Sequence, residues 1–180
     1  MDRSSLRTQL ERLHRESYGW ALHCCARHPD EAADVLQTVY LKILEDKARY
    51  DGKATFKTWL FAVIRNTAAD AHRRHEHRRA LQHRLRLVRE EASFQPVVPQ
   101  EHLEESVDRA HLRAWFRQAL ADLSERQREV LHLVMYHDLT LEEAAQVMGV
   151  SLGSARTHYA RGKQQLRQRL KATGTFDAPG

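Results

Sequence analysis

The sequence predicts an all-α protein made of two small helical domains joined by a flexible linker, with a helix-turn-helix in the C-terminal domain. Glycine (7) and proline (4) are scarce among the 180 residues, as is typical of helical proteins. Apolar residues recur at helical spacing, and no useful stretch alternates with the period of a strand. The hydrophobic content of 42% excludes a wholly disordered chain.

The N-terminal domain is expected over residues 1–91. An amphipathic helix near 4–27 is predicted to stop before Pro29, which then begins a second helix because proline suits the first helical turn. Polar residues 47–53 predict a loop, and Thr55 is positioned to cap a third helix. A long basic helix is expected to follow and to reach about Glu91.

Residues 92–105 are the expected linker, since the proline-containing stretch from Ser93 to Glu101 has no helical period. The C-terminal domain is then expected over residues 106–173. Its helices are predicted near 106–121, 125–136, 141–148 and 152–171.

The charge is basic and unevenly distributed. The net charge is +5 with a pI near 9.5, which favours a polyanionic partner, either nucleic acid or an acidic lipid surface. Aspartate and glutamate are absent from Ala144 to Phe176. The start of the chain has no apolar signal core, and the longest apolar run, Trp59 to Ile64, cannot span a bilayer. A cytoplasmic protein is expected.

The segment Leu141 to Arg161 has the pattern of a helix-turn-helix, which needs a small residue at the helix crossing and a glycine in the turn. Ala145 and Gly149 fit these roles, and Ser151 can cap the second helix. The apolar residues expected to hold the helix pair together are Ala144, Met148, Val150 and Ala155. The alternative is an ordinary helical hairpin with a solvated basic face.

The run Leu120–Leu131, the helix-turn-helix and Arg161–Leu166 together resemble the C-terminal domain of extracytoplasmic-function sigma factors of the sigma-70 superfamily. In that family this domain reads the minus-thirty-five promoter element. The resemblance implies minus-thirty-five contacts by Ser154, Arg156, Thr157, His158, Arg161 and Lys163. The chain departs from the family in having Ala155 where a β-branched residue is favoured and His158 where arginine is common.

Two N-terminal segments extend the resemblance. Ala33–Leu44 resembles the family's helix that docks on the clamp coiled coil of RNA polymerase, and this implies core-polymerase contacts by Asp34, Gln37, Thr38 and Leu41. Phe56–Asn66 with the following residues resembles the segment that captures the melted minus-ten element, and this implies minus-ten contacts by Arg65, Asn66, Arg73 and Arg74. Trp59 and Phe61 are expected to pack inward, as aromatic residues at helical spacing usually do.

The resemblance implies core RNA polymerase and promoter DNA as partners, and an anti-sigma factor or a regulatory kinase as further candidates. Ala33 and Thr38 stand where the family commonly has glutamate. One hypothesis is therefore that phosphorylation of Thr38 restores negative charge for polymerase binding. Neither a cofactor nor a small-molecule substrate is expected.

Two other classes of function compete with this interpretation. A two-domain transcriptional regulator would bind duplex DNA and a small ligand without replacing a sigma subunit. A metal sensor would use His23, Cys24, Cys25 and His28, but on one helix only Cys24 and His28 share a face, so no metal site is expected. The adjacent cysteines are expected to stay reduced. No catalytic residue is predicted, because the sequence has no phosphate-binding loop or nucleophile elbow.

Overall fold

The computed structural model describes residues 3–86, 120 and 122–172. Within these ranges the chain forms six α-helices and no strand, which confirms the predicted fold class. The expected linker 92–105 and most of the helix expected at 106–121 lie outside the described residues.

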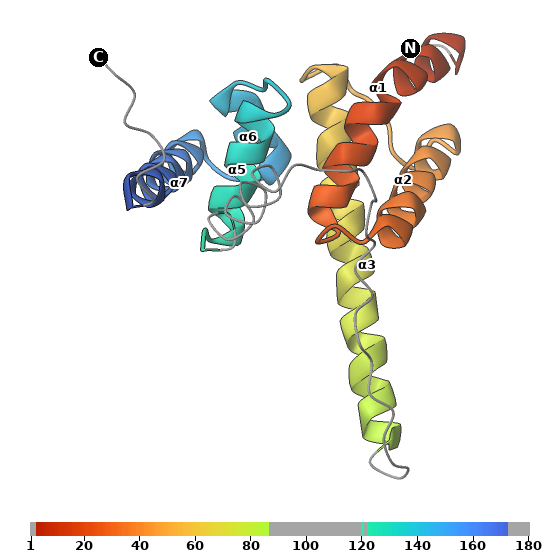
Figure 1. Ribbon diagram of the computed structural model, residues 1–180. Helices are drawn as coiled ribbons and strands as arrows, with labels where there is room; N and C mark the ends of the chain where they lie inside the picture. Colours follow the sequence, from red (N-terminus) through yellow and green to blue (C-terminus); the bar gives the residue numbers. More distant parts are fainter. Residues whose placement is uncertain (1–2, 87–119, 121, 173–180) are drawn as a thin grey trace, which may run out of the picture.

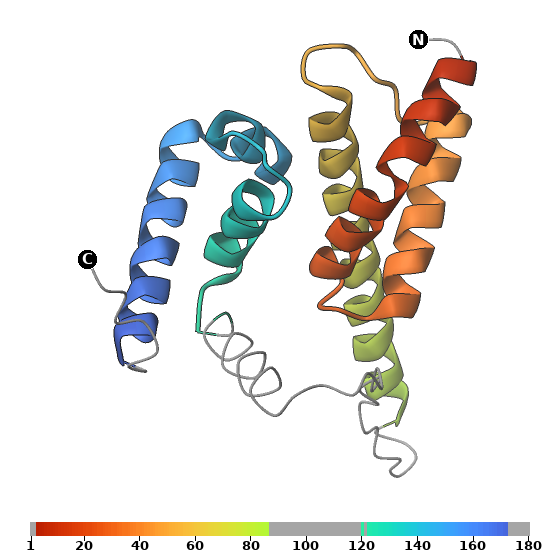
Figure 2. The same ribbon diagram turned by 45° about the horizontal axis from the view of Figure 1, so that its top comes forward.

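The N-terminal unit consists of three helices that pack on one another: α1 (Arg3–Cys24), α2 (Pro29–Leu44) and α3 (Phe56–Arg86). Figures 1 and 2 show α3 extending well beyond α1 and α2. Pro29 opens α2, with Asp30 and Glu31 in the first turn, where carboxylates interact favourably with the helix dipole. Thr55 caps α3, since its hydroxyl accepts a hydrogen bond from the Thr58 amide (3.1 Å).

The bounds of two helices differ from the expectation. α1 ends at Cys24 rather than near Arg27, because Ala26 and Arg27 adopt positive φ angles of 49° and 66°. The chain reverses there without a glycine. α3 runs unbroken from Phe56 to Arg86, where two successive helices were expected. Nothing between them breaks a helix, and the intervening Thr67 and Ala68 are buried.

The C-terminal unit consists of α5 (Glu125–Met135), α6 (Leu141–Met148) and α7 (Leu152–Ala172). α5 and α6 each begin with a capping box, formed by Ser124 with Gln127 and by Thr140 with Glu143. Gly149 ends α6 in the left-handed conformation at φ 64°, which glycine adopts without steric cost. α6 and α7 therefore form the predicted helix-turn-helix.

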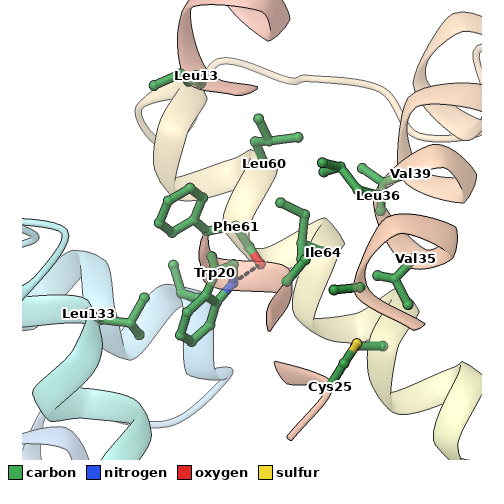
Figure 3. Close-up of a cluster of buried hydrophobic side chains, with 14 of the residues drawn as sticks. Leu13, Trp20, Cys25, Val35, Leu36, Val39, Leu60, Phe61, Ile64 and Leu133 are labelled. Atoms are coloured by element: carbon green, nitrogen blue, oxygen red, sulfur yellow. Dashed lines mark hydrogen bonds between the residues drawn. The ribbon is translucent and has the colours of Figure 1, made fainter. Parts of the chain in front are cut away.

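The two units lie against each other and share one continuous core. Figures 1 and 2 place α5 and α6 next to the α1–α3 unit, and α6 contacts α3 directly. Trp20 is fully buried at this boundary, and its indole donates a hydrogen bond to the Phe61 carbonyl oxygen (3.0 Å). Leu133 of α5 is buried in the same cluster (Figure 3).

Candidate nucleic-acid interface

The exposed face of α7 begins within its first turn. Ser151 caps the helix by accepting a hydrogen bond from the Ser154 amide (3.1 Å), as predicted. Ala155 is completely buried against the unit, so its neighbours in sequence turn outward. Ser154, Arg156 and Thr157 are exposed and His158 is partly exposed. Side chains at the N-terminal end of such a helix are the ones that reach base edges in the major groove.

The remainder of α7 presents cations. Arg161 is exposed, and the Lys163 ammonium lies 4.4 Å from the centre of the Tyr159 ring. Arg156 contacts Glu142 of α6 at 3.4 Å, and Arg169 pairs with Asp122. The helix itself contains no carboxylate. The basic face predicted from the sequence therefore forms one solvent-accessible surface along α7.

The four residues predicted for minus-ten contacts occupy different environments on α3. Asn66, Arg73 and Arg74 are exposed, and Arg73 pairs with Asp70 one turn earlier. Arg65 is different, because its guanidinium forms an ion pair with Glu129 of α5 and only 20% of its side chain is exposed. In this arrangement the C-terminal unit covers Arg65.

The candidate polymerase-binding face lies on α2. Val35, Val39 and Ile43 are buried, as the sequence predicted for the core side of this helix. The predicted contact residues Asp34, Gln37 and Leu41 are exposed, and Thr38 is partly exposed. Leu44, which the sequence analysis did not select, is also 46% exposed. It borders a groove of about 490 Å³ between α1 and α2, lined by Arg7, Leu10, Glu11, His14, Tyr40 and Leu44.

Sequence reasoning missed the polar residues at the boundary between the units. Glu129 is 6% exposed, and its carboxylate forms ion pairs with Arg65 of α3 and with Arg126 of its own helix, α5. His137 is 2% exposed, and its carbonyl oxygen accepts a hydrogen bond from Lys57 of α3 (2.9 Å). Glu143 of α6 accepts a hydrogen bond from the Thr58 hydroxyl (3.2 Å). Of these residues only Glu129 lies in α5, where a polar side chain at an apolar-phase position was the one sequence signal.

Among the residues that the structure describes, the cysteine and histidine side chains do not converge on a shared metal site. Cys24 and Cys25 are free thiols, and burial raises the pKa of both, that of Cys25 to about 11. The raised pKa values keep both thiols protonated at neutral pH. Within the described residues no group of three or more histidine, cysteine or carboxylate side chains is arranged to hold a metal ion.

Of the described helices, none is long and apolar enough to cross a membrane. Phe61 is buried as predicted, whereas Trp59 is only partly buried.

Comparison with known proteins agrees with the geometry of both units. Residues 10–78 match the family described as Sigma-70 region 2, and residues 119–168 match Sigma-70, region 4. RNA polymerase sigma factor YlaC of Bacillus subtilis is 26% identical over 91% of this chain and 93% of its own length. ECF RNA polymerase sigma factor ShbA of Streptomyces griseus is 33% identical over 79% of this chain and 72% of its own length.

The solved structures show the same fold. The sigma factor RpoE, crystallised in complex with the anti-sigma factor NepR from Bartonella quintana, matches with a TM-score of 0.67 and 22% identity. The match covers 93% of this chain and 97% of RpoE. Region 2 coincides with the α1–α3 unit and region 4 with the helix-turn-helix unit. The chain belongs to the ECF RNA polymerase sigma factors of the sigma-70 family.

Proposed function

We propose that this chain binds core RNA polymerase through α2, reads promoter DNA with α3 and α7, and so directs initiation without performing chemistry itself. The observation that carries the proposal is the helix-turn-helix. Its second helix is free of carboxylates and exposes Arg156 and Thr157 at the end that enters the groove. The protein would act in the cytoplasm, where core polymerase and promoters meet.

Each proposed contact of α7 has a distinct chemical role. Ser154, Arg156, Thr157 and His158 would meet base edges of the minus-thirty-five element, since hydroxyl, guanidinium and imidazole groups read the major groove by hydrogen bonds. Arg161 and Lys163 would contact phosphates, which fix the register of the helix but do not read sequence. Each phosphate neutralised steepens the salt dependence of binding by about one logarithmic unit.

On α3 we assign Arg65, Asn66, Arg73 and Arg74 to the minus-ten element. A melted strand is held by cationic and polar side chains beside its unstacked bases. Asn66, Arg73 and Arg74 are exposed, so a DNA strand could reach their side chains. Arg65 can contribute only after its ion pair with Glu129 is broken.

The face of α2 formed by Asp34, Gln37, Thr38 and Leu41 would dock on polymerase. It combines a carboxylate and polar groups with an exposed leucine, so it offers both hydrogen-bonding and apolar contacts to a partner. A kinase acting on Thr38 and an anti-sigma factor are proposed regulators. The second proposal is supported by the similarity to RpoE, whose structure contains such a partner.

Transcription in vitro tests the proposal directly. The full chain is added to core polymerase with a library of genomic fragments, and the 5′ ends of the transcripts are mapped. Defined start sites that require the chain are expected, with a shared pair of upstream elements. Sequence-specific duplex binding by the chain without polymerase, and no start sites with it, would instead identify a stand-alone DNA-binding regulator.

A further inference from the structure

Three histidines meet where the C-terminal unit rests on the N-terminal unit. His23 comes from α1, His132 from α5 and His137 from the loop before α6. The His23 and His132 rings stack with their centres 4.2 Å apart. The His132 and His137 rings meet edge to face, with their centres 4.9 Å apart. Trp20 stacks on both His23 (5.2 Å) and His132 (5.7 Å). We call His23, His132 and His137 the histidine cluster.

The surroundings of the histidine cluster favour the neutral form of all three imidazole rings. Burial is the main cause that lowers the pKa of His23 to about 3 and those of His132 and His137 to about 4. His132 Nε2 and both ring nitrogens of His137 are buried and have no hydrogen-bond partner among the described residues. A proton added to any of these nitrogens would place an unsolvated charge inside the boundary, and this is strongly unfavourable.

The charges that surround the histidine cluster also oppose protonation. Arg128 of α5 and Arg27, which follows α1, disfavour a charge on His23, and Lys57 of α3 disfavours one on His137. Glu16 of α1 acts in the opposite sense, since its carboxylate lies 3.9 Å from His137 Nδ1. That carboxylate is already paired with Lys57, so it only partly compensates.

The same boundary holds Arg65 against Glu129. We propose that the histidine cluster is a pH-sensitive latch between the two units: neutral rings keep the units together with Arg65 covered, and protonation separates them and exposes Arg65. The latch itself rests on the stacking and burial of the three rings at this boundary. Its consequence for promoter binding rests on the proposed function.

The direction of the effect follows from the lowered pKa values. A histidine freed by separation titrates near its ordinary value of about 6.5, whereas in the closed form it stays neutral down to about pH 4. The closed form is therefore fully favoured above about pH 6.5 and loses stability as the pH falls below it. At pH 5.5 each histidine shifts the equilibrium towards the open form by about tenfold.

Small-angle X-ray scattering of the full chain between pH 8 and pH 5.5 measures the separation. The radius of gyration of the wild type is expected to increase as the pH falls, while far-UV circular dichroism shows that the helices persist. The double variant H23F/H132F keeps aromatic rings that cannot titrate, so its dimensions are expected to respond much less. H132R, which carries a permanent charge, is expected to be open already at pH 8.

Replacing two exposed histidines outside the boundary provides the matched control. H14F/H72F loses the same number of titratable rings and is expected to open like the wild type. A wild-type radius that stays constant to pH 5.5, or an H23F/H132F profile equal to that of the wild type, would overturn the proposal. If H23F/H132F does not fold, NMR titration of the wild type decides, because pKa values near 6.5 for all three histidines exclude the latch. A chain that opens yet directs no transcription would refute the proposed function alone.

Discussion

Arg156 is the side chain of α7 through which we propose that the fold determines promoter choice. The burial of Ala155 turns Arg156 towards solvent, where its guanidinium contacts Glu142 only loosely, at 3.4 Å. A weak exposed ion pair of this kind contributes little to stability, so DNA can displace it at small cost. A bidentate arginine–guanine pair discriminates against a wrong base by about 1–3 kcal/mol.

We therefore expect Arg156→Ala to weaken promoter binding by the polymerase holoenzyme by about tenfold or more, with the fold and polymerase affinity unchanged. Filter binding or fluorescence anisotropy on a promoter selected by the chain measures the change. R12A removes an exposed arginine from α1 and is the matched control. Equal losses for both variants would indicate a general charge effect and not a base contact.

Thr38 offers a second prediction at the residue scale. This partly exposed residue lies on the α2 face one turn after the exposed Asp34, so a negative charge there extends an acidic surface. Thr38→Glu is expected to raise affinity for core polymerase several-fold, by the gain of a charge-assisted hydrogen bond. Surface plasmon resonance on immobilised core enzyme measures this affinity. T8E places the same charge on α1 and should have no effect; an unchanged or weaker T38E would reject the charge hypothesis.

The sequence revealed exposed functional positions better than buried ones. Arg156, Thr157 and Asn66 could be placed on outward faces because helical periodicity alone determines which side of a helix they occupy. Glu129, His132 and His137 could not be predicted, since their placement at the boundary arises from contact between two units far apart in the sequence. Arg65 was expected on a DNA-binding face, and its partner Glu129 could be identified only from the three-dimensional arrangement.

At the scale of elements, local signals predicted the helices where capping chemistry is present. The bounds of α6 agree with those expected, because Thr140 and Gly149 define both ends of the helix. The end of α1 was misplaced because its reversal uses Ala26 and Arg27, residues that give no sequence signal of a left-handed turn. α3 continues because no helix-breaking residue stands between its two expected parts, and Thr67 and Ala68 at the join are buried.

The capping box of α6 leads to a prediction about stability. The Thr140 hydroxyl accepts a hydrogen bond from the Glu143 amide (3.2 Å), and the Glu143 carboxylate accepts one from the Thr140 amide (3.0 Å). Thr140→Ala is expected to lower the free energy of unfolding by about 1 kcal/mol, measured by urea denaturation. T140S keeps the hydroxyl and should retain most of the stability. A T140S variant as unstable as T140A would show that the methyl group matters more than the cap.

At the scale of the whole molecule, the closed arrangement opposes the proposed activity. The core extends from Leu10 of α1 to Met148 of α6, so the two DNA-reading units are held side by side by apolar contacts. Ion pairs and the histidine cluster then decide how firmly they stay together. A boundary that contains several charged and titratable groups is easier to open than a purely apolar one, because each charged group regains its hydration on separation.

Glu129 gives the sharpest test of this balance. Its carboxylate is 6% exposed and is neutralised by Arg65 of α3 and Arg126 of α5. Glu129→Gln retains the shape but removes the charge, and a lost charge-assisted hydrogen bond costs about 1.5–3 kcal/mol. We expect the open form to increase by about tenfold to a hundredfold. Affinity for a forked DNA carrying a single-stranded minus-ten element should rise, measured by anisotropy at constant salt and pH.

Arg65→Ala separates opening from DNA contact. This variant loses the same ion pair, so scattering should show it as open as E129Q. It also lacks the cation proposed to hold the melted strand, so its affinity for the forked DNA should stay below that of E129Q. If both variants gained DNA affinity equally, Arg65 would have no part in minus-ten binding, and if neither expanded, the Arg65–Glu129 pair would not hold the units together.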